Sequence, residues 1–199
     1  RGAPVFPHNP AAADDPGTAS LRHYLHEAAT RVQARQDEGL FRLPVDRVFT
    51  LAGHGTVVAG TVFSGQICTG DTVILMPANT PVRVRSIHAQ DRVADRGHAG
   101  QRCALNVVGV EKSAISRGDW LADSRILAPT TRIDVHLRVL ADSKQNLAAW
   151  SPIHVHVATT HRVAHVVPLE SDRLSAGESA RAQLVFDTPV CALPGDRFI

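Results

Sequence analysis

DRVFTLAGHGTVVAGTVFSGQICTGD, residues 46–71, is the stretch that decides the expected fold. Runs of Val, Thr and Phe on both sides of Gly53 and Gly55 are typical of two short strands joined by a turn. The glycines also resemble a nucleotide-binding loop, but β-branched residues surround them and the sequence contains no GxxxxGK[ST] phosphate loop. The stretch therefore predicts a β-hairpin with a glycine-rich turn.

Short runs of the same kind continue outward from this hairpin along most of the chain. Gly, Asp, Asn or Pro separates most of them, a spacing typical of antiparallel barrels and sandwiches. The pattern breaks near residues 124–130. We expect an all-β fold of two consecutive antiparallel β-barrels, residues 41–126 and 127–199, with the last strand of the second barrel missing. The runs are 42–51, 55–65, 71–76, 82–90, 101–110, 132–140, 153–160, 162–169 and 180–188.

Residues 1–40 have a different pattern. The first 18 are rich in Pro, Ala, Gly and Asp, which is typical of a linker. An apolar stripe then follows at helical spacing, with Thr18 or Ser20 as the expected N-cap and Gly39 as the end of the segment. We expect one helix that packs on a domain outside this sequence, which we take to be part of a longer protein. The stripe consists of Leu21, Tyr24, Leu25, Ala28 and Val32.

Composition and motifs exclude several classes of function. The 199 residues carry 21 basic and 19 acidic side chains, a net charge of +2, which argues against a polybasic tail. Cys68, Cys103 and Cys191 form no CxxC pair, so we expect neither a disulfide framework nor a zinc ribbon, and a cytoplasmic location fits. No run approaches the roughly 18 apolar residues of a membrane span. Because GxSxG, HExxH and nucleophile constellations are also missing, we expect no catalytic residue in this chain.

Four histidines form the one candidate metal cluster. Alternate residues of a strand share a face, so the first two could point at one ion. No Asp, Glu or Cys lies within the stretch to complete a typical ligand set, and solvated or polyanion-facing histidines are the competing interpretation. A metal-dependent β-barrel enzyme thus stays an alternative from another functional class. The four are His154, His156, His161 and His165.

The hairpin belongs to a longer ordered pattern. Residues 46–71 resemble the second domain of the translational GTPases of the EF-Tu type, in which G-x-G-T-V, G-T-V and G-x-I-x-x-G-D follow an apolar strand. AGQRCALNVVGVEKSAISRGDWLA, residues 99–122, matches the family's next segment. VRVRSIHAQ at 82–90 and the block 131–199 are similar to the selenocysteine-specific elongation factors (SelB). The helix at 17–29 looks like the last helix of the family's GTPase domain.

This resemblance implies a function and a site. The family binds selenocysteinyl-tRNA, delivers it to the ribosome at UGA codons with GTP and Mg, and holds an mRNA hairpin through C-terminal domains that this sequence lacks. We expect a monomer with no cofactor of its own in this segment. The resemblance implies a selenocysteinyl pocket at Asp46, Arg47 and Arg102, and tRNA backbone contacts at Thr159, Thr160, His161 and Arg162.

The chemistry of the cargo gives the pocket a physical rationale. Selenocysteine and serine differ by one atom, and a small steric difference discriminates by only about 1–3 kcal/mol. A selenol is more acidic than a thiol and is ionised at pH 7, whereas a serine hydroxyl is neutral. Two guanidiniums would attract the selenolate, and Asp46 could hold one of them in place. Two alternatives stay open: an ordinary surface pair of Asp46 with Arg47 beside a solvated Arg102, or another translational GTPase with a different cargo.

Overall fold

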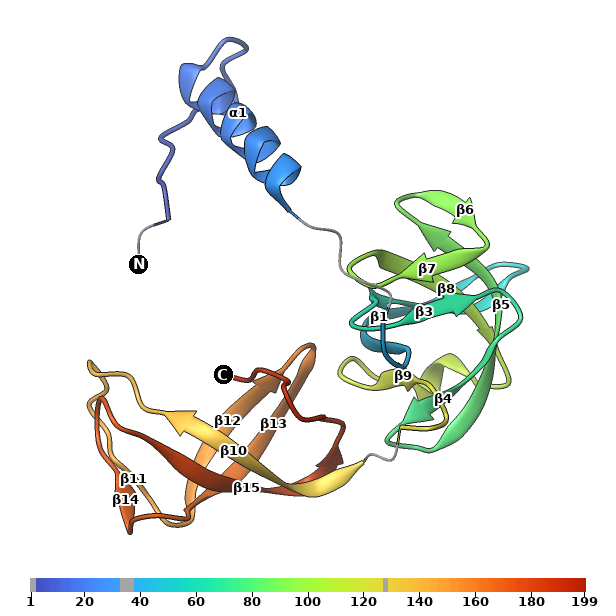
Figure 1. Cartoon of the computed structure of the whole chain (residues 1–199). Coiled ribbons are helices and arrows are strands. Elements are labelled where there is room, and N and C mark those ends of the chain that lie inside the picture. Colours follow the sequence, from blue (N-terminus) through green and yellow to red (C-terminus); the bar gives the residue numbers. More distant parts are fainter. Residues whose placement is uncertain (1–2, 33–37, 127–128) are drawn as a thin grey trace. The chain divides into compact units, whose positions relative to one another are not determined.

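The computed structural model describes residues 3–32, 38–126 and 129–199. The chain divides into two compact units, residues 1–35 and 36–199, each of which is considered by itself. The first unit contains helix α1, Pro16–Arg31 (Figure 1). Asp15 is its N-cap and accepts a hydrogen bond from the Thr18 backbone N–H at 2.7 Å. The predicted caps Thr18 and Ser20 were wrong, because Pro16 at the first helical position starts the helix earlier.

The second unit contains fifteen strands and confirms the all-β prediction for the described residues. Its first part is a closed barrel in the order β4-β9-β1-β2-β8-β5, with β5 pairing back to β4. The bounds are β1 Arg42–Leu51, β2 Gly55–Thr61, β3 Gln66–Cys68, β4 Thr72–Met76, β5 Thr80–Ala89, β6 Arg92–Ala94, β7 Arg96–His98, β8 Arg102–Val108 and β9 Trp120–Ala122. A 3₁₀ turn, η1, covers Lys112–Ala114.

Alternating apolar side chains fill this barrel. Leu43 and Val45 of β1, Val58 of β2 and Leu105 of β8 are completely buried in one cluster. β1 and β2 form the predicted hairpin, in which Leu51 pairs with Gly55. Gly53 and Gly55 have φ angles of +76° and +84°, which explains why the turn needs glycine.

The second part of this unit, residues 129–199, is called the second barrel below and consists of an antiparallel sheet in the order β10-β15-β13-β12 and the strand pair β11-β14. Its own core contains Val155, Ala164, Leu184 and Phe186. Near the end of the chain Phe198 bridges to Val157, and Ile199 exchanges two backbone hydrogen bonds with His156. The bounds are β10 Thr130–Arg138, β11 Leu147–Ala148, β12 Ser151–Val157, β13 Thr160–Pro168, β14 Arg173–Leu174 and β15 Ser179–Val190.

Candidate functional site

A β-bulge in β1 sets the direction of the first two pocket candidates. The register between β1 and β2 shifts between Val45 and Arg47. Val45 and Val48 both pack in the barrel core although they are three residues apart. The two residues between them, Asp46 and Arg47, therefore share the outer face of the barrel, which a regular strand with alternating side chains would not allow.

Arg102 joins this face from β8. Its Nε and Nη2 donate to the two carboxylate oxygens of Asp46 at 3.0 and 2.9 Å, a bidentate pair between residues 56 positions apart. These hydrogen bonds raise the pKa of Arg102, so the guanidinium keeps its charge. The side chain of Arg102 remains 58% exposed, whereas that of Asp46 is 26% exposed. The pair is therefore oriented yet open to a ligand.

Arg47 lies on the same face of the barrel. Arg47 pairs across the sheet with Ala59, and Ala59 pairs with Ala104, two residues beyond Arg102. Residues at these positions point to one side of the sheet. Arg47 is exposed, and within residues 3–32, 38–126 and 129–199 its guanidinium has neither an ion-pair nor a hydrogen-bond partner. Asp46 thus pairs with Arg102 instead of with Arg47, and all three residues belong to the same outer face of the barrel.

The second group of candidates, Thr159 to Arg162, lies at the start of β13 and divides into two kinds. Thr160 is buried, and its hydroxyl donates to the backbone O of Gly118 in the first barrel at 2.6 Å. Thr159 Oγ1 is also buried. Neither hydroxyl is available to a phosphate, so the expected tRNA contact of Thr159 and Thr160 does not fit the structure. His161 is exposed, and Arg162 is partly exposed and donates to the His161 backbone O at 2.9 Å.

The four histidines do not converge on one point. His154 and His156 face His161 across the β12–β13 hairpin, with an N–N distance of 2.8 Å from His154 Nδ1 to His161 Nε2. His165 instead stacks on Trp150, with 5.2 Å between ring centroids. In the part of the chain that the structure describes, no group of three or more His, Cys, Asp or Glu side chains has the arrangement of a metal site. The metal-dependent alternative therefore has no ligand set here.

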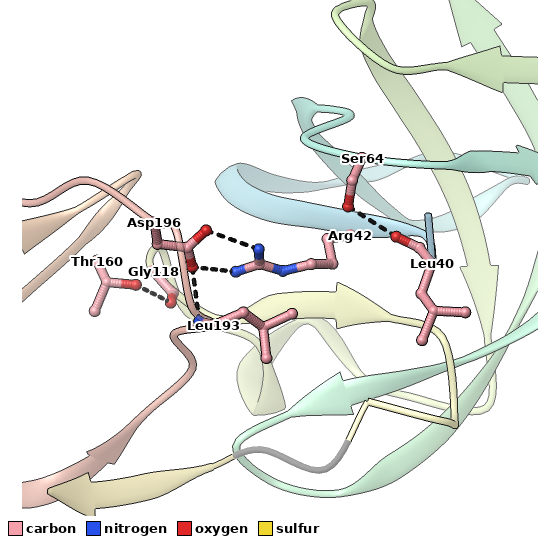
Figure 2. Close-up of polar contacts among 7 residues, drawn as sticks. All are labelled: Leu40, Arg42, Ser64, Gly118, Thr160, Leu193 and Asp196. Carbon is pink, nitrogen blue, oxygen red and sulfur yellow. Dashed lines mark hydrogen bonds and ion pairs between the residues drawn. The ribbon is translucent and has the colours of Figure 1, made fainter. Parts of the chain in front are cut away.

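A polar clamp, the ion pair between Arg42 and Asp196, joins the two barrels and was not predicted from the sequence. Arg42 donates to both carboxylate oxygens of Asp196, at 2.9 and 2.6 Å, and the two side chains are only 8% and 11% exposed (Figure 2). The guanidinium also lies 4.5 Å from the ring centroid of Trp120, and Asp196 accepts the Leu193 backbone N–H. Because Asp196 is 154 positions from Arg42, no local sequence signal could have revealed this pair.

Apolar residues from both barrels surround the clamp. Met76, Trp120, Ala122 and Ile126 of the first barrel pack with Cys191 of the second. Burial, and then the charge of Asp119, raise the pKa of the Cys191 thiol to about 11. Burial also raises the pKa of Asp119, although its hydrogen bond from Ser116 and the charge of Arg162 oppose the shift. The interface is therefore a dry environment in which charge is costly unless it is paired.

Known proteins resemble both halves of this unit. Residues 55–122 match the family profile described as elongation factor Tu domain 2. Residues 131–199 match the profile described as selenocysteine-specific elongation factor, beta-barrel domain. Among the described residues, no helix has the length and apolar character needed to cross a membrane.

Individual relatives agree with these profiles. The chain is 40% identical over 190 residues to a selenocysteine-specific elongation factor of Escherichia coli, covering 95% of the chain and 29% of that protein. It is 35% identical over 198 residues to one from Desulfomicrobium baculatum, covering 100% of the chain and 31% of that protein. The apo structure of translation elongation factor SelB from Methanococcus maripaludis shares the fold, with a TM-score of 0.79 and 24% identity over 92% of this chain and 43% of that one. The chain thus spans less than a third of the two curated relatives.

Proposed function

Since the chain belongs to the selenocysteine-specific elongation factors, we propose that its first barrel binds the aminoacyl end of selenocysteinyl-tRNA. The binding site is the outer face that carries Asp46, Arg47 and Arg102. The observation that carries the proposal is the bidentate Asp46–Arg102 pair on the same face as Arg47, whose guanidinium has no partner among the described residues. Asp46 orients one guanidinium and leaves the other free.

The charges of this face match the cargo. One carboxylate and two guanidiniums have a net charge of +1, so an ionised selenol neutralises the group. A serine hydroxyl is somewhat smaller and brings no charge, and it would partly cover Arg47 without pairing it. Covering an unpaired charge costs free energy, because the charge loses water and gains no partner. The face therefore discriminates by charge, where a steric pocket would discriminate weakly.

The rest of the function belongs to the longer protein. We infer that it delivers the charged tRNA to the ribosome at UGA codons, that GTP and Mg bind in segments outside this chain, and that further domains hold the mRNA hairpin. His161 and Arg162 remain candidates for contact with the tRNA backbone, where a cation positions the RNA without reading its sequence. We also propose that the protein is monomeric and located in the cytoplasm.

Neutralising the two arginines tests the proposal. In the full-length factor with GTP, Arg47→Gln and Arg102→Gln should each lower the ratio of affinities for selenocysteinyl- over seryl-tRNA by about tenfold, which corresponds to about 1.4 kcal/mol. Arg83→Gln is the matched control, because Arg83 is exposed on the same barrel but pairs with Val108, at the opposite end of β8 from Arg102. An unchanged ratio in both pocket variants would favour a translational GTPase with a different cargo.

A further inference from the structure

We propose that Thr160, in the second barrel, is a positioning residue for the arginine pocket of the first barrel. This inference rests on the proposed function and adds to it a specificity-determining residue that never touches the cargo. A short path of hydrogen bonds leads from the Thr160 hydroxyl to the bulge that presents Asp46 and Arg47. The loop from Arg117 to Asp119 is the intermediate.

The first step of the path is the contact between Thr160 and Gly118. The Thr160 side chain is buried, and its hydroxyl donates to the Gly118 backbone O at 2.6 Å (Figure 2). Gly118 has a φ of +95°, and a Cβ added there would lie 3.0 Å from the Thr160 Cα. The positive φ and the close approach of the two backbones therefore both favour glycine at position 118. The second barrel thus fixes the position of this loop.

The second step connects the loop to the pocket strand. The backbone N–H of Gly118 donates to the Val45 O at 3.0 Å, and the Val45 N–H donates to the Asp119 O at 2.8 Å. Both groups of Val45 are thus held by the same loop. Val45 is the last regularly paired residue before the bulge, and Asp46 follows it directly. Any shift of residues 118–119 must move the bulge and change the geometry between Asp46 and Arg102.

The Arg42–Asp196 clamp holds the same strand at its start. β1 is therefore fastened to the second barrel at Arg42 and, through the loop, at Val45. The bulge lies immediately after the second of these points. In this arrangement the second barrel positions the side chains of the proposed selenocysteinyl pocket, in addition to any contact that it makes with tRNA.

Thr159 supplies a matched control for Thr160. Its hydroxyl is also buried but has no hydrogen-bond partner among the described residues. Thr159→Val therefore removes no hydrogen bond, whereas Thr160→Val leaves the Gly118 carbonyl without its donor at nearly constant side-chain volume. Thr160→Ser keeps the hydroxyl and tests for rescue.

The direct test measures the Arg102 Nε–H of this chain by NMR. Thr160→Val should accelerate hydrogen exchange of this group by about fivefold, because the Asp46–Arg102 pair opens more often. Thr159→Val and Thr160→Ser should leave the rate at the wild-type value. Equal exchange rates in all folded variants would overturn the proposal. If Thr160→Val does not fold, Thr160→Cys, which keeps a weaker donor, replaces it and should give a smaller change in the same direction.

A second test measures the consequence for specificity. In the full-length factor, Thr160→Val should lower the preference for selenocysteinyl- over seryl-tRNA by about threefold or more, with wild-type preference in Thr159→Val. A variant that loses thermal stability but keeps this preference would show that Thr160 is merely structural. The two proposals fail separately: if the Arg47 and Arg102 variants keep their preference but Thr160→Val still accelerates exchange at Arg102, the proposed cargo is wrong and the positioning path stands.

Discussion

At the residue scale, the charged side chains lie in two different environments. Arg42 is buried and Asp196 largely so, and the two are paired with each other, so their charges serve the interface between the barrels. Arg47 and Arg102 are exposed, and one of them has no partner within the described ranges. Because exposed ion pairs contribute little to stability, the Asp46–Arg102 pair is better explained by orientation than by folding.

Cys191 gives a pH-dependent prediction at this scale. Burial raises the pKa of its thiol from 9.0 to about 11, so the folded chain holds this proton more tightly than the unfolded chain. The free energy of unfolding should therefore fall as pH rises from about 9 to about 11, by about 2–3 kcal/mol from this group. Urea unfolding at several pH values measures it.

Cys191→Ala provides the comparison for this pH effect. The variant should lose the part of the decline that belongs to the thiol, so the difference in stability between wild type and variant should shrink above pH 9. Identical pH profiles in the two proteins would show that the thiol is not the titrating group.

Individual residues also show which features of the site could be predicted from the sequence and which could not. The family pattern pointed to Asp46, Arg47 and Arg102, and the structure brings Asp46 and Arg102 into contact. The same pattern pointed to Thr160, which the structure buries against Gly118. Local sequence shows the type of a side chain but not what packs over it, so burial by a second domain could not be predicted.

At the scale of elements, length decided which strands could be predicted. The expected runs contain the nine strands of five or more residues or overlap them, since each has enough β-branched residues to show a pattern. The six strands of two or three residues, β3, β6, β7, β9, β11 and β14, are too short to show a period. The bulge in β1 could not be predicted either, because the core residues Val45 and Val48 are three positions apart and do not fit the alternating pattern of a regular strand.

Gly60 tests the packing of the element that carries the pocket. A methyl group at Gly60 would overlap the Pro44 carbonyl O and lie 2.6 Å from Leu43 Cδ2. Gly60→Ala should push β1 away from β2 and destabilise the chain by about 1–3 kcal/mol. Denaturant unfolding measures the loss, with the exposed neighbour substitution Thr61→Ala as control. A loss no greater than that of the control would mean that the two strands are not packed this closely.

At the scale of the whole second unit, residues 36–199, the buried clamp predicts that the two barrels depend on each other. Arg42→Met removes the cation that pairs with the largely buried Asp196 carboxylate, which keeps only its hydrogen bond from the Leu193 backbone N–H, and should destabilise the chain by about 3 kcal/mol. Adding Asp196→Leu removes that carboxylate, so the double variant should regain much of the stability. Thermal unfolding followed by fluorescence measures both, with Trp120 in the first barrel and Trp150 in the second.

A double variant less stable than Arg42→Met would contradict the clamp as described.

The interface between the barrels is also the feature of the whole unit that could not be predicted from the sequence. The sequence predicted two barrels but offered no contact between them, because the pairs Arg42–Asp196 and Gly118–Thr160 join residues 154 and 42 positions apart.

The proposed pocket selects its cargo by charge, and cysteine separates the effect of charge from the effect of size. Sulfur and selenium are of similar size, but a cysteine thiol is mostly neutral at pH 7 and ionises with a pKa of about 8.5. The measurement is the affinity of the full-length factor with GTP for tRNA charged with selenocysteine, cysteine or serine, at pH 7 and pH 9. If the pocket selects by charge, the affinity for cysteinyl-tRNA should approach that for selenocysteinyl-tRNA at pH 9, while the affinity for seryl-tRNA stays low. A gap between cysteine and selenocysteine that is unchanged from pH 7 to pH 9 would contradict it.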